Sequence, residues 1–393
     1  MYPARFSNLP PYAFPRLRAL LAGIPAGGPV MSMTIGEPQH AFPSWIAPII
    51  AEEMAGFGKY PANDGLPVLR AEIAAWFNRR YGVPLDPETQ IMPLNGTREG
   101  LYSAGMVLGP ETKDGQPIVL MPNPLYPDYM VSTIRHGAKP IFVPATAEKG
   151  HLPDYSSVSP AVLNRTSLCY ICSPANPQGA VASRDYWKAL LTLAEQYDFK
   201  VLADECYSEI YRNAPPSGAM EVAHEMGIDP NRVVVFHSLS KRSNLPGLRA
   251  GFVASGAETI RRFNQLRSYA GAPPPNPLQV VAARVWADEA HVIENRALYA
   301  AKYTLADEIF GNVPGYTPPE AGFFLWLPVK DGQAATVKLW KETGVRVLPG
   351  AFLSQEQDGV IPGVGYIRVA MVSEFYEMKR GLETLYNSLF EVR

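Results

Sequence analysis

The chain has 393 residues, of which 47% are hydrophobic and 18% are charged. At roughly 150 residues per domain, this length predicts two or three domains with a sizeable core. The formal net charge of −2 gives no indication of a nucleic-acid or membrane partner, and no apolar run is long enough to span a bilayer. Three cysteines and no signal-peptide pattern predict a cytoplasmic protein without a disulfide framework.

In chain order, the sequence divides into three predicted parts. Residues 1–45 are rich in Pro and Gly and are expected to form an arm that packs on the C-terminal part. In residues 46–289, short apolar runs alternate with helical patterns, which indicates an α/β domain with a mostly parallel sheet between helices. The apolar runs, each an expected buried strand, lie at 118–121, 140–143, 168–172, 200–203, 232–236 and 250–254. The clearest helical pattern is at 183–198, with Ser183 as its N-cap.

Residues 290–393 have a different pattern, which predicts a smaller α+β domain. A long helix at 291–311 leads to an aromatic strand at 323–329. Two shorter strands are expected at 345–349 and 366–370, and a final helix at 373–390. The six histidines lack metal-ligand spacing, and Cys169 and Cys172 fall on opposite faces of a strand, so no metal site is predicted.

Polar side chains follow several of the predicted strands. Asn176 follows the strand at 168–172, Asp204 and Tyr207 follow the next one, and Ser238 and Lys241 follow the strand at 232–236. Ligands of open parallel sheets bind beyond the carboxyl ends of the strands, so these groups are expected to meet at one edge. A lysine next to a buried strand is costly unless it is paired or used in chemistry.

This combination of groups fits pyridoxal 5′-phosphate (PLP). Its aldehyde forms a Schiff base with a lysine amine, for which Lys241 is the candidate. Asp204 would pair with the protonated pyridine nitrogen, and Tyr207 and Asn176 would donate to the ring oxygen. The phosphate would bind Arg249, Ser238 and a helix N-terminus formed by Gly96, Thr97 and Arg98.

With these motifs in place, nearly the whole chain resembles the fold-type I, class I/II aminotransferases. The motifs are "SLSK" with Arg249 eight residues beyond Lys241, "DECYSEI", and "SPANPQG", in which Gln178 stands where the family usually has Thr. The resemblance implies a large PLP-binding domain with a seven-stranded, mostly parallel sheet. It also implies amino-acid and keto-acid substrates, with glutamate and 2-oxoglutarate as one pair, and ping-pong transfer in which Lys241 moves the α-proton.

The resemblance implies further site residues and a homodimer. Tyr60 in "KYPANDGLPVLR" would reach the phosphate bound by the partner subunit, and Tyr126 in "PLYPDY" would stack on the cofactor ring. Arg368 in "YIRVA" would bind the substrate α-carboxylate, together with Asn176 and with Gly36 in "IGEP".

For the substrate, "GTREGLY" and "GEPQH" are most similar to bacterial N-succinyldiaminopimelate aminotransferases of lysine biosynthesis. Such a substrate has extra carboxylates and needs a second cation, for which Arg98, Arg242 and Arg18 are the candidates. Aspartate, aromatic amino acids and LL-diaminopimelate are alternative substrates, and a C–S β-lyase is an alternative reaction.

Two alternatives from other classes lack supporting features. Ser238-Leu-Ser-Lys241 also matches the S-x-x-K motif of acyl-serine hydrolases, but the S-D-N and K-T-G motifs of those enzymes are missing from the sequence. A transcriptional regulator with a PLP-binding fold would usually carry a DNA-binding module, and no such pattern is found before residue 45.

Overall fold

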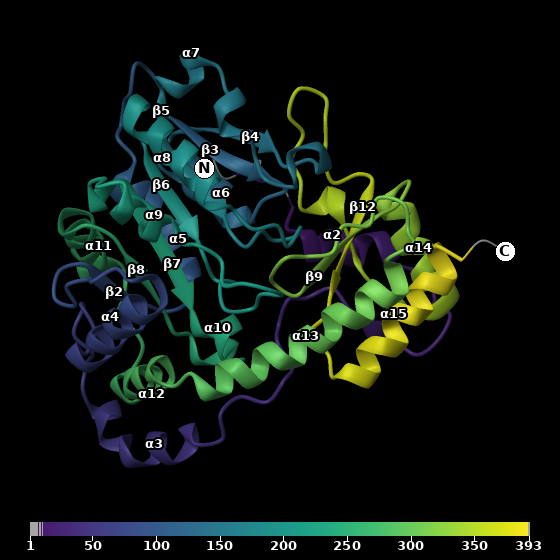
Figure 1. Cartoon of the computed structure of the whole chain (residues 1–393), viewed down its shortest axis with the longest axis horizontal. Helices are drawn as coiled ribbons and strands as arrows, with labels where there is room; N and C mark the ends of the chain where they lie inside the picture. The colour runs from purple at the N-terminus through teal and green to yellow at the C-terminus, as the bar shows by residue number, and fades with distance from the viewer. Residues whose placement is uncertain (1–6, 8, 10, 392–393) are drawn as a thin grey trace.

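The larger part of the molecule is built around a seven-stranded sheet (Figure 1). The computed structural model describes residues 7, 9 and 11–391. The strand order is β2-β8-β7-β6-β5-β3-β4, and all neighbours are parallel except β8, which runs antiparallel to both β2 and β7. The predicted α/β fold with a mostly parallel sheet is therefore confirmed. The strands are β2 (Ile91–Leu94), β3 (Ile118–Asn123), β4 (Lys139–Pro144), β5 (Thr166–Cys172), β6 (Lys200–Asp204), β7 (Val233–Ser238) and β8 (Gly251–Ala254).

Six of these strands match the predicted apolar runs, and β2 is the strand that the pattern did not reveal. Its four residues include Pro93, which lacks an N–H for the sheet ladder. Proline is tolerated in edge strands, and β2 lies at the edge of this sheet next to β8. A short run that contains proline therefore carried too weak a signal to be identified as a strand from the sequence.

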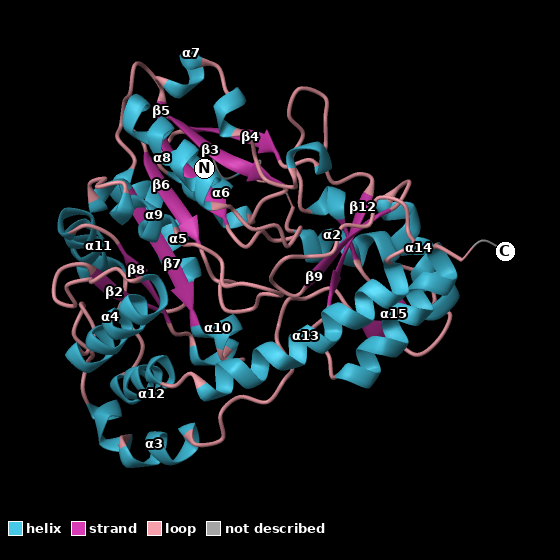
Figure 2. Ribbon diagram, viewed as in Figure 1, coloured by secondary structure: helices cyan, strands magenta, loops and turns pink. Residues whose placement is uncertain are grey.

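Helices cover both faces of the sheet, and each face has its own hydrophobic core (Figure 2). One core contains buried side chains of α3 (Ile46–Glu52), α4 (Pro67–Tyr81), α7 (Pro160–Leu163), α8 (Arg184–Tyr197), α9 (Ala219–Glu225) and α12 (Asn276–Ala287). The other contains side chains of α5 (Thr97–Leu108), α6 (Pro127–Arg135) and α11 (Ala257–Ala270). The predicted N-cap of α8 is confirmed, since the Ser183 side chain accepts from the backbone N–H of Tyr186.

Successive side chains of β6 and β7 point to opposite faces of the sheet, and this alternation determines on which face the polar residues at the strand ends lie. Leu202 and Phe236 belong to the core under α5, α6 and α11. Side chains two residues apart in a strand point to the same face, so Asp204 and Ser238 lie on that face as well. The carboxyl ends of the parallel strands thus present their functional groups toward α5 and α6.

The C-terminal part surrounds a three-stranded antiparallel sheet of order β11-β12-β9. Its strands are β9 (Phe324–Pro328), β11 (Leu348–Pro349) and β12 (Tyr366–Ala370), and its core includes side chains of α13 (Ala290–Phe310), α14 (Gly332–Thr343) and α15 (Phe375–Leu389). The single strand predicted at 345–349 is two strands in the structure. Residues Val345–Arg346 form β10 and pair with β1 (Met31–Ser32), whereas β11 pairs with β12.

The N-terminal segment includes a helix that contacts this C-terminal part. Helix α2 (Ala13–Leu21) buries Ala13, Leu17 and Leu21 against Trp326 and Leu348. Helix α13 runs from the end of α12 toward α15 and connects the two regions (Figure 1). The domain limits of 1–45, 46–289 and 290–393 stay a prediction. Among the described residues, no helix is long and apolar enough to span a membrane.

Candidate active site

A cavity of about 520 Å³ lies at the carboxyl ends of the central strands. Twelve of the thirteen predicted site residues line it, namely Gly36, Gly96, Thr97, Arg98, Tyr126, Asn176, Asp204, Tyr207, Ser238, Lys241, Arg249 and Arg368. The exception is Tyr60, which is 99% exposed and lies outside this cavity. Its predicted place in the site of a partner subunit stays a prediction.

Lys241 projects into the cavity from α10 (Leu239–Arg242), a short helix directly after β7. Ser238 ends the strand and caps this helix, because its side chain accepts from the Ser240 N–H. The Lys241 Nζ donates to the carbonyl of Gly36 at 2.6 Å. Burial lowers the pKa of the Lys241 amine to about 8, so roughly a tenth of the amine is neutral and nucleophilic at pH 7, far more than for an ordinary lysine.

Arg368, Asn176 and Tyr207 form a chain of hydrogen bonds along one wall of the cavity. The Arg368 Nη1 donates to Asn176 Oδ1 at 3.1 Å, and Asn176 Nδ2 donates to the Tyr207 hydroxyl at 3.2 Å. The Arg368 Nη2 donates to the carbonyl of Thr34 at 2.7 Å, and its guanidinium lies 4.2 Å from the centre of the Phe324 ring. Burial lowers the pKa of Arg368 to about 10, which still leaves it positively charged at neutral pH.

An anion-binding wall lies where α5 begins. Helix α5 starts at Thr97, so its first backbone N–H groups are free to bind an anion. Arg249 lies against this turn, and its guanidinium donates to the carbonyls of Asn95 and Pro246, each at 2.9 Å. Gly96 has a φ of 78°, and a Cβ at this position would overlap the Arg249 guanidinium. Only glycine allows the turn and the guanidinium to come this close.

Tyr126 and Arg98 are in direct contact with each other. The Arg98 Nε donates to the Tyr126 hydroxyl at 2.7 Å and lies 3.4 Å from Asp128 Oδ1. Arg98 is exposed, so part of its charge remains available to a ligand, although Asp128 neutralises some of it.

The cavity also contains residues that the sequence analysis did not identify, among them Glu37, Tyr129, Cys172 and Cys206. Tyr129 donates to Asp204, and it follows Tyr126 by three residues at the start of α6. That i, i+3 spacing could have revealed it, because such residues lie on the same side of a helix. Cys172 belongs to the hydrophobic core and lines the cavity as well.

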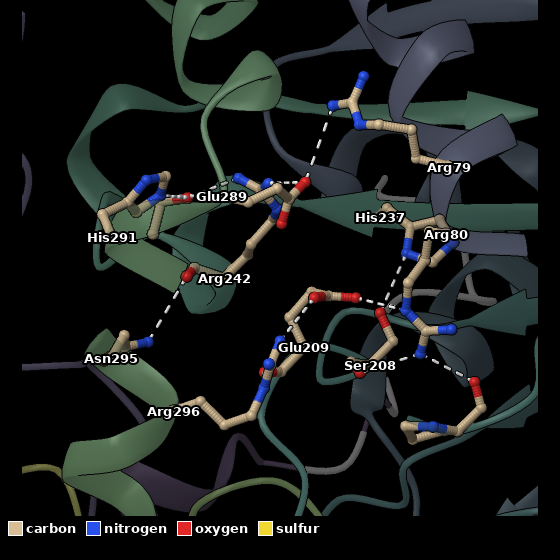
Figure 3. A network of polar contacts seen from close by, with 12 residues as sticks. Arg79, Arg80, Ser208, Glu209, His237, Arg242, Glu289, His291, Asn295 and Arg296 are labelled. Atoms are coloured by element: carbon tan, nitrogen blue, oxygen red, sulfur yellow. Dashed lines mark hydrogen bonds and ion pairs between the residues drawn. The ribbon is translucent and has the colours of Figure 1, made fainter. Parts of the chain in front are cut away.

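Of the three candidates for a second substrate-binding cation, the cavity includes Arg98 and neither Arg242 nor Arg18. The proposal for Arg242 was wrong for a structural reason. Its guanidinium donates to the carbonyls of Val285 and Asp288 at 2.9 and 3.0 Å. It also pairs with Glu289 at 2.9 Å (Figure 3). Arg242 therefore anchors the helix that carries Lys241.

The residues present fit PLP. The cavity brings together a lysine amine with a lowered pKa, a buried carboxylate at Asp204, hydroxyl and amide donors, and a helix N-terminus beside an arginine. Arg368 also has a buried Nε without a hydrogen-bond partner among the described residues, so it has an unused donor. The lysine would hold the cofactor aldehyde, Asp204 the ring nitrogen, and the hydroxyl and amide donors the ring oxygen. The helix N-terminus with its arginine would hold the phosphate, and Arg368 the substrate carboxylate.

Comparisons with known proteins agree with this geometry. The family model for class I and II aminotransferases matches residues 28–385. An LL-diaminopimelate aminotransferase of Dehalococcoides mccartyi is 32% identical over 396 residues, covering 98% of this chain and 97% of that protein. A protein of the same name from Syntrophobacter fumaroxidans is 30% identical, with 97% of each chain covered.

Solved structures give the same result. An aminotransferase from Neisseria meningitidis has a TM-score of 0.93 and 37% identity, with 98% of this chain and 99% of that chain covered. Aminotransferase AspB from Helicobacter pylori has a TM-score of 0.89 and 31% identity, with 96% and 98% covered.

Proposed function

The chain belongs to the class I and II aminotransferases, which are PLP-dependent, and we propose that it transfers the amino group of LL-diaminopimelate to a keto acid such as 2-oxoglutarate. This proposal replaces the N-succinyldiaminopimelate substrate expected from sequence resemblance. The relatives named above support the change, because both are called LL-diaminopimelate aminotransferases.

In the proposed reaction, Arg368 binds the α-carboxylate of the substrate. Asn176 orients the Arg368 guanidinium through the 3.1 Å hydrogen bond, and Gly36 leaves room beside it, since a Cβ there would overlap the Phe324 ring. When bound, PLP supplies a ring that stabilises negative charge at the substrate α-carbon. The Lys241 Nζ takes the α-proton and later returns a proton to the cofactor, and Asp204 keeps the ring nitrogen protonated.

The substrate assignment rests mainly on one observation: two side chains that line the cavity, Arg98 and Glu37, carry opposite charges. The Glu37 carboxylate is exposed. Among the described residues it makes no hydrogen bond or ion pair, although its charge also acts on the Lys241 amine. The distal end of LL-diaminopimelate carries one ammonium and one carboxylate, which match Glu37 and Arg98. An N-succinyl substrate has two carboxylates and no ammonium at that end, so Glu37 would repel it.

A half-reaction screen tests the proposal. The purified holoenzyme is mixed with LL-diaminopimelate, N-succinyl-LL-diaminopimelate, aspartate or phenylalanine without a keto acid, and loss of the cofactor absorbance band is followed. We expect the fastest loss with LL-diaminopimelate. Glu37→Gln should slow that substrate by about tenfold and should not slow aspartate, which has no distal ammonium.

Three outcomes would contradict this proposal. Faster reaction with the N-succinyl substrate would return the assignment to the original expectation. Equal effects of Glu37→Gln on LL-diaminopimelate and aspartate would remove the proposed role of Glu37. Release of pyruvate from cystathionine without a keto acid would indicate a C–S β-lyase.

We also propose that the enzyme works as a cytoplasmic homodimer with Tyr60 in the partner's site. The exposure of large apolar side chains near Tyr60, such as Met54 and Phe57, supports a covered interface there. Sedimentation of the wild-type protein tests whether it is a dimer. Titration of the wild type and of Tyr60→Phe with PLP tests whether Tyr60 contributes to cofactor binding. A monomeric wild type or unchanged PLP affinity in the variant would contradict this part.

A further inference from the structure

Tyr129 makes a buried hydrogen bond to the carboxylate proposed to face the cofactor ring. Its hydroxyl donates to Asp204 Oδ2 at 2.7 Å, and neither side chain is substantially exposed. The other oxygen, Oδ1, accepts a longer bond of 3.4 Å from the backbone N–H of Cys206. Tyr129 therefore makes the shorter of these two hydrogen bonds, and the Cys206 side chain also interacts with the carboxylate.

The position of the Tyr129 hydroxyl is fixed by its surroundings. Its ring stacks on Tyr170, with 4.6 Å between the ring centres and 9° between the planes. The Tyr170 hydroxyl donates to the carbonyl of Leu101 at 2.8 Å and lies 3.1 Å from Ser132 Oγ. Two fully buried rings attached to β5 and α6 thus leave the phenol little freedom to leave Asp204.

The charge state of each partner follows from burial. Burial raises the pKa of Asp204, which disfavours its ionised form, whereas the hydrogen bonds from the Cys206 side chain and from Tyr129 favour that form. Burial and the neighbouring carboxylate raise the pKa of the Tyr129 phenol well above its usual value. The phenol consequently keeps its proton and remains a donor throughout the neutral pH range.

From this geometry we propose that Tyr129 is a positioning residue, which holds Asp204 ionised and oriented so that the pyridine nitrogen of bound PLP keeps its proton. The inference rests on the proposed role of Asp204 toward the cofactor but is independent of which amino acid is the substrate. A donor to the carboxylate lowers its affinity for the pyridinium proton, so the proton stays on the ring nitrogen.

The test is the ¹⁵N resonance of holoenzyme loaded with PLP labelled at the ring nitrogen. In the wild type it should lie at the upfield position of a protonated pyridine. Tyr129→Phe should move it downfield, toward an unprotonated ring, and should weaken PLP binding about tenfold. An unchanged resonance in this variant would overturn the proposal.

Tyr170→Phe is the matched control, because it also removes one buried hydroxyl but has no contact with Asp204. It should leave the resonance and the PLP affinity as in the wild type. If it shifted the resonance as much as Tyr129→Phe does, the effect would come from packing, and the proposal would fail. Replacing Tyr129 with 3-fluorotyrosine, a stronger donor of similar size, should shift the resonance upfield, and a downfield shift would also overturn the proposal.

Asp204→Ala separates this inference from the proposed role of Asp204. We expect the largest downfield shift in this variant. An unchanged resonance in Asp204→Ala would show that Asp204 does not pair with the ring nitrogen, and both statements would then be wrong. A shift in Asp204→Ala without one in Tyr129→Phe would overturn the inference about Tyr129 alone.

Discussion

The guanidinium of Arg368 is held by the amide of Asn176, with 3.1 Å between Nη1 and Oδ1, although the two residues come from different sheets. Asn176 follows β5 of the large sheet, and Arg368 lies within β12 of the small sheet. The hydrogen bond places the proposed carboxylate-binding arginine beside the proposed cofactor-binding residues.

Replacing Arg368 with Leu should affect only substrates that carry a carboxylate. We expect kcat/KM for amino and keto acids to fall at least about 100-fold, because the variant loses a bidentate ion pair with the substrate. Amines without a carboxylate should react at a rate similar to that of the wild type. Steady-state and half-reaction kinetics measure both, and an equal loss for amines would contradict the assignment.

Lys241→Ala should abolish transamination while the protein still folds. The Lys241 side chain makes one hydrogen bond, to Gly36, so its loss removes little packing. Circular dichroism checks the fold. Borohydride treatment of the wild type should attach the cofactor to a single peptide that contains Lys241. Labelling of another lysine, for example Lys302, would refute the assignment.

The rate at which apoenzyme takes up PLP covalently should depend on pH through the Lys241 amine. Only the neutral amine attacks the aldehyde, and the pKa of about 8 means that this form increases with pH until about 8. The rate should rise about tenfold per pH unit below pH 8 and level off above it. Stopped-flow absorbance between pH 6.5 and 10 measures it. A rate that still rises steeply at pH 10 would indicate an unperturbed lysine.

Gly96→Ala should weaken PLP binding, because its Cβ would displace the Arg249 guanidinium. Gly82→Ala is the matched control. Gly82 has a similar positive φ of 67°, but a Cβ there would have no neighbour within 4 Å. Both variants should lose about 1 kcal/mol of stability from backbone strain, and only Gly96→Ala should raise the dissociation constant for PLP. Similar PLP affinities in the two variants would contradict the phosphate site.

Arg242→Met should destabilise the protein by about 2–4 kcal/mol, because it leaves one buried and one partly buried carbonyl without their donor. Arg79 pairs with the same Glu289 but is largely exposed (Figure 3), so Arg79→Met should cost less than about 1 kcal/mol. Thermal unfolding of the two variants as holoenzymes measures the loss of stability that each substitution causes. Equal losses of stability would show that Arg242 does not anchor α10 in this way.

The sequence by itself determined the α/β class and most of the site. Short apolar runs predict buried strands, and the polar residues that follow them must meet at the carboxyl edge of a parallel sheet. For this reason the sequence predicts that Asn176, Asp204, Ser238 and Lys241 meet at one edge of the sheet, where all four line the cavity in the structure.

Only the tertiary structure decided which side chains of similar type serve the site. The sequence does not distinguish Arg98 from Arg242 as a substrate-binding cation. In the structure Arg242 donates to the backbone carbonyls of Val285 and Asp288, whereas Arg98 lines the cavity. Tyr129 likewise was not identified from the sequence, and its role toward Asp204 follows from the hydrogen bond between them. Such contacts join residues far apart in the chain, and their geometry depends on how helices and strands pack rather than on any local pattern.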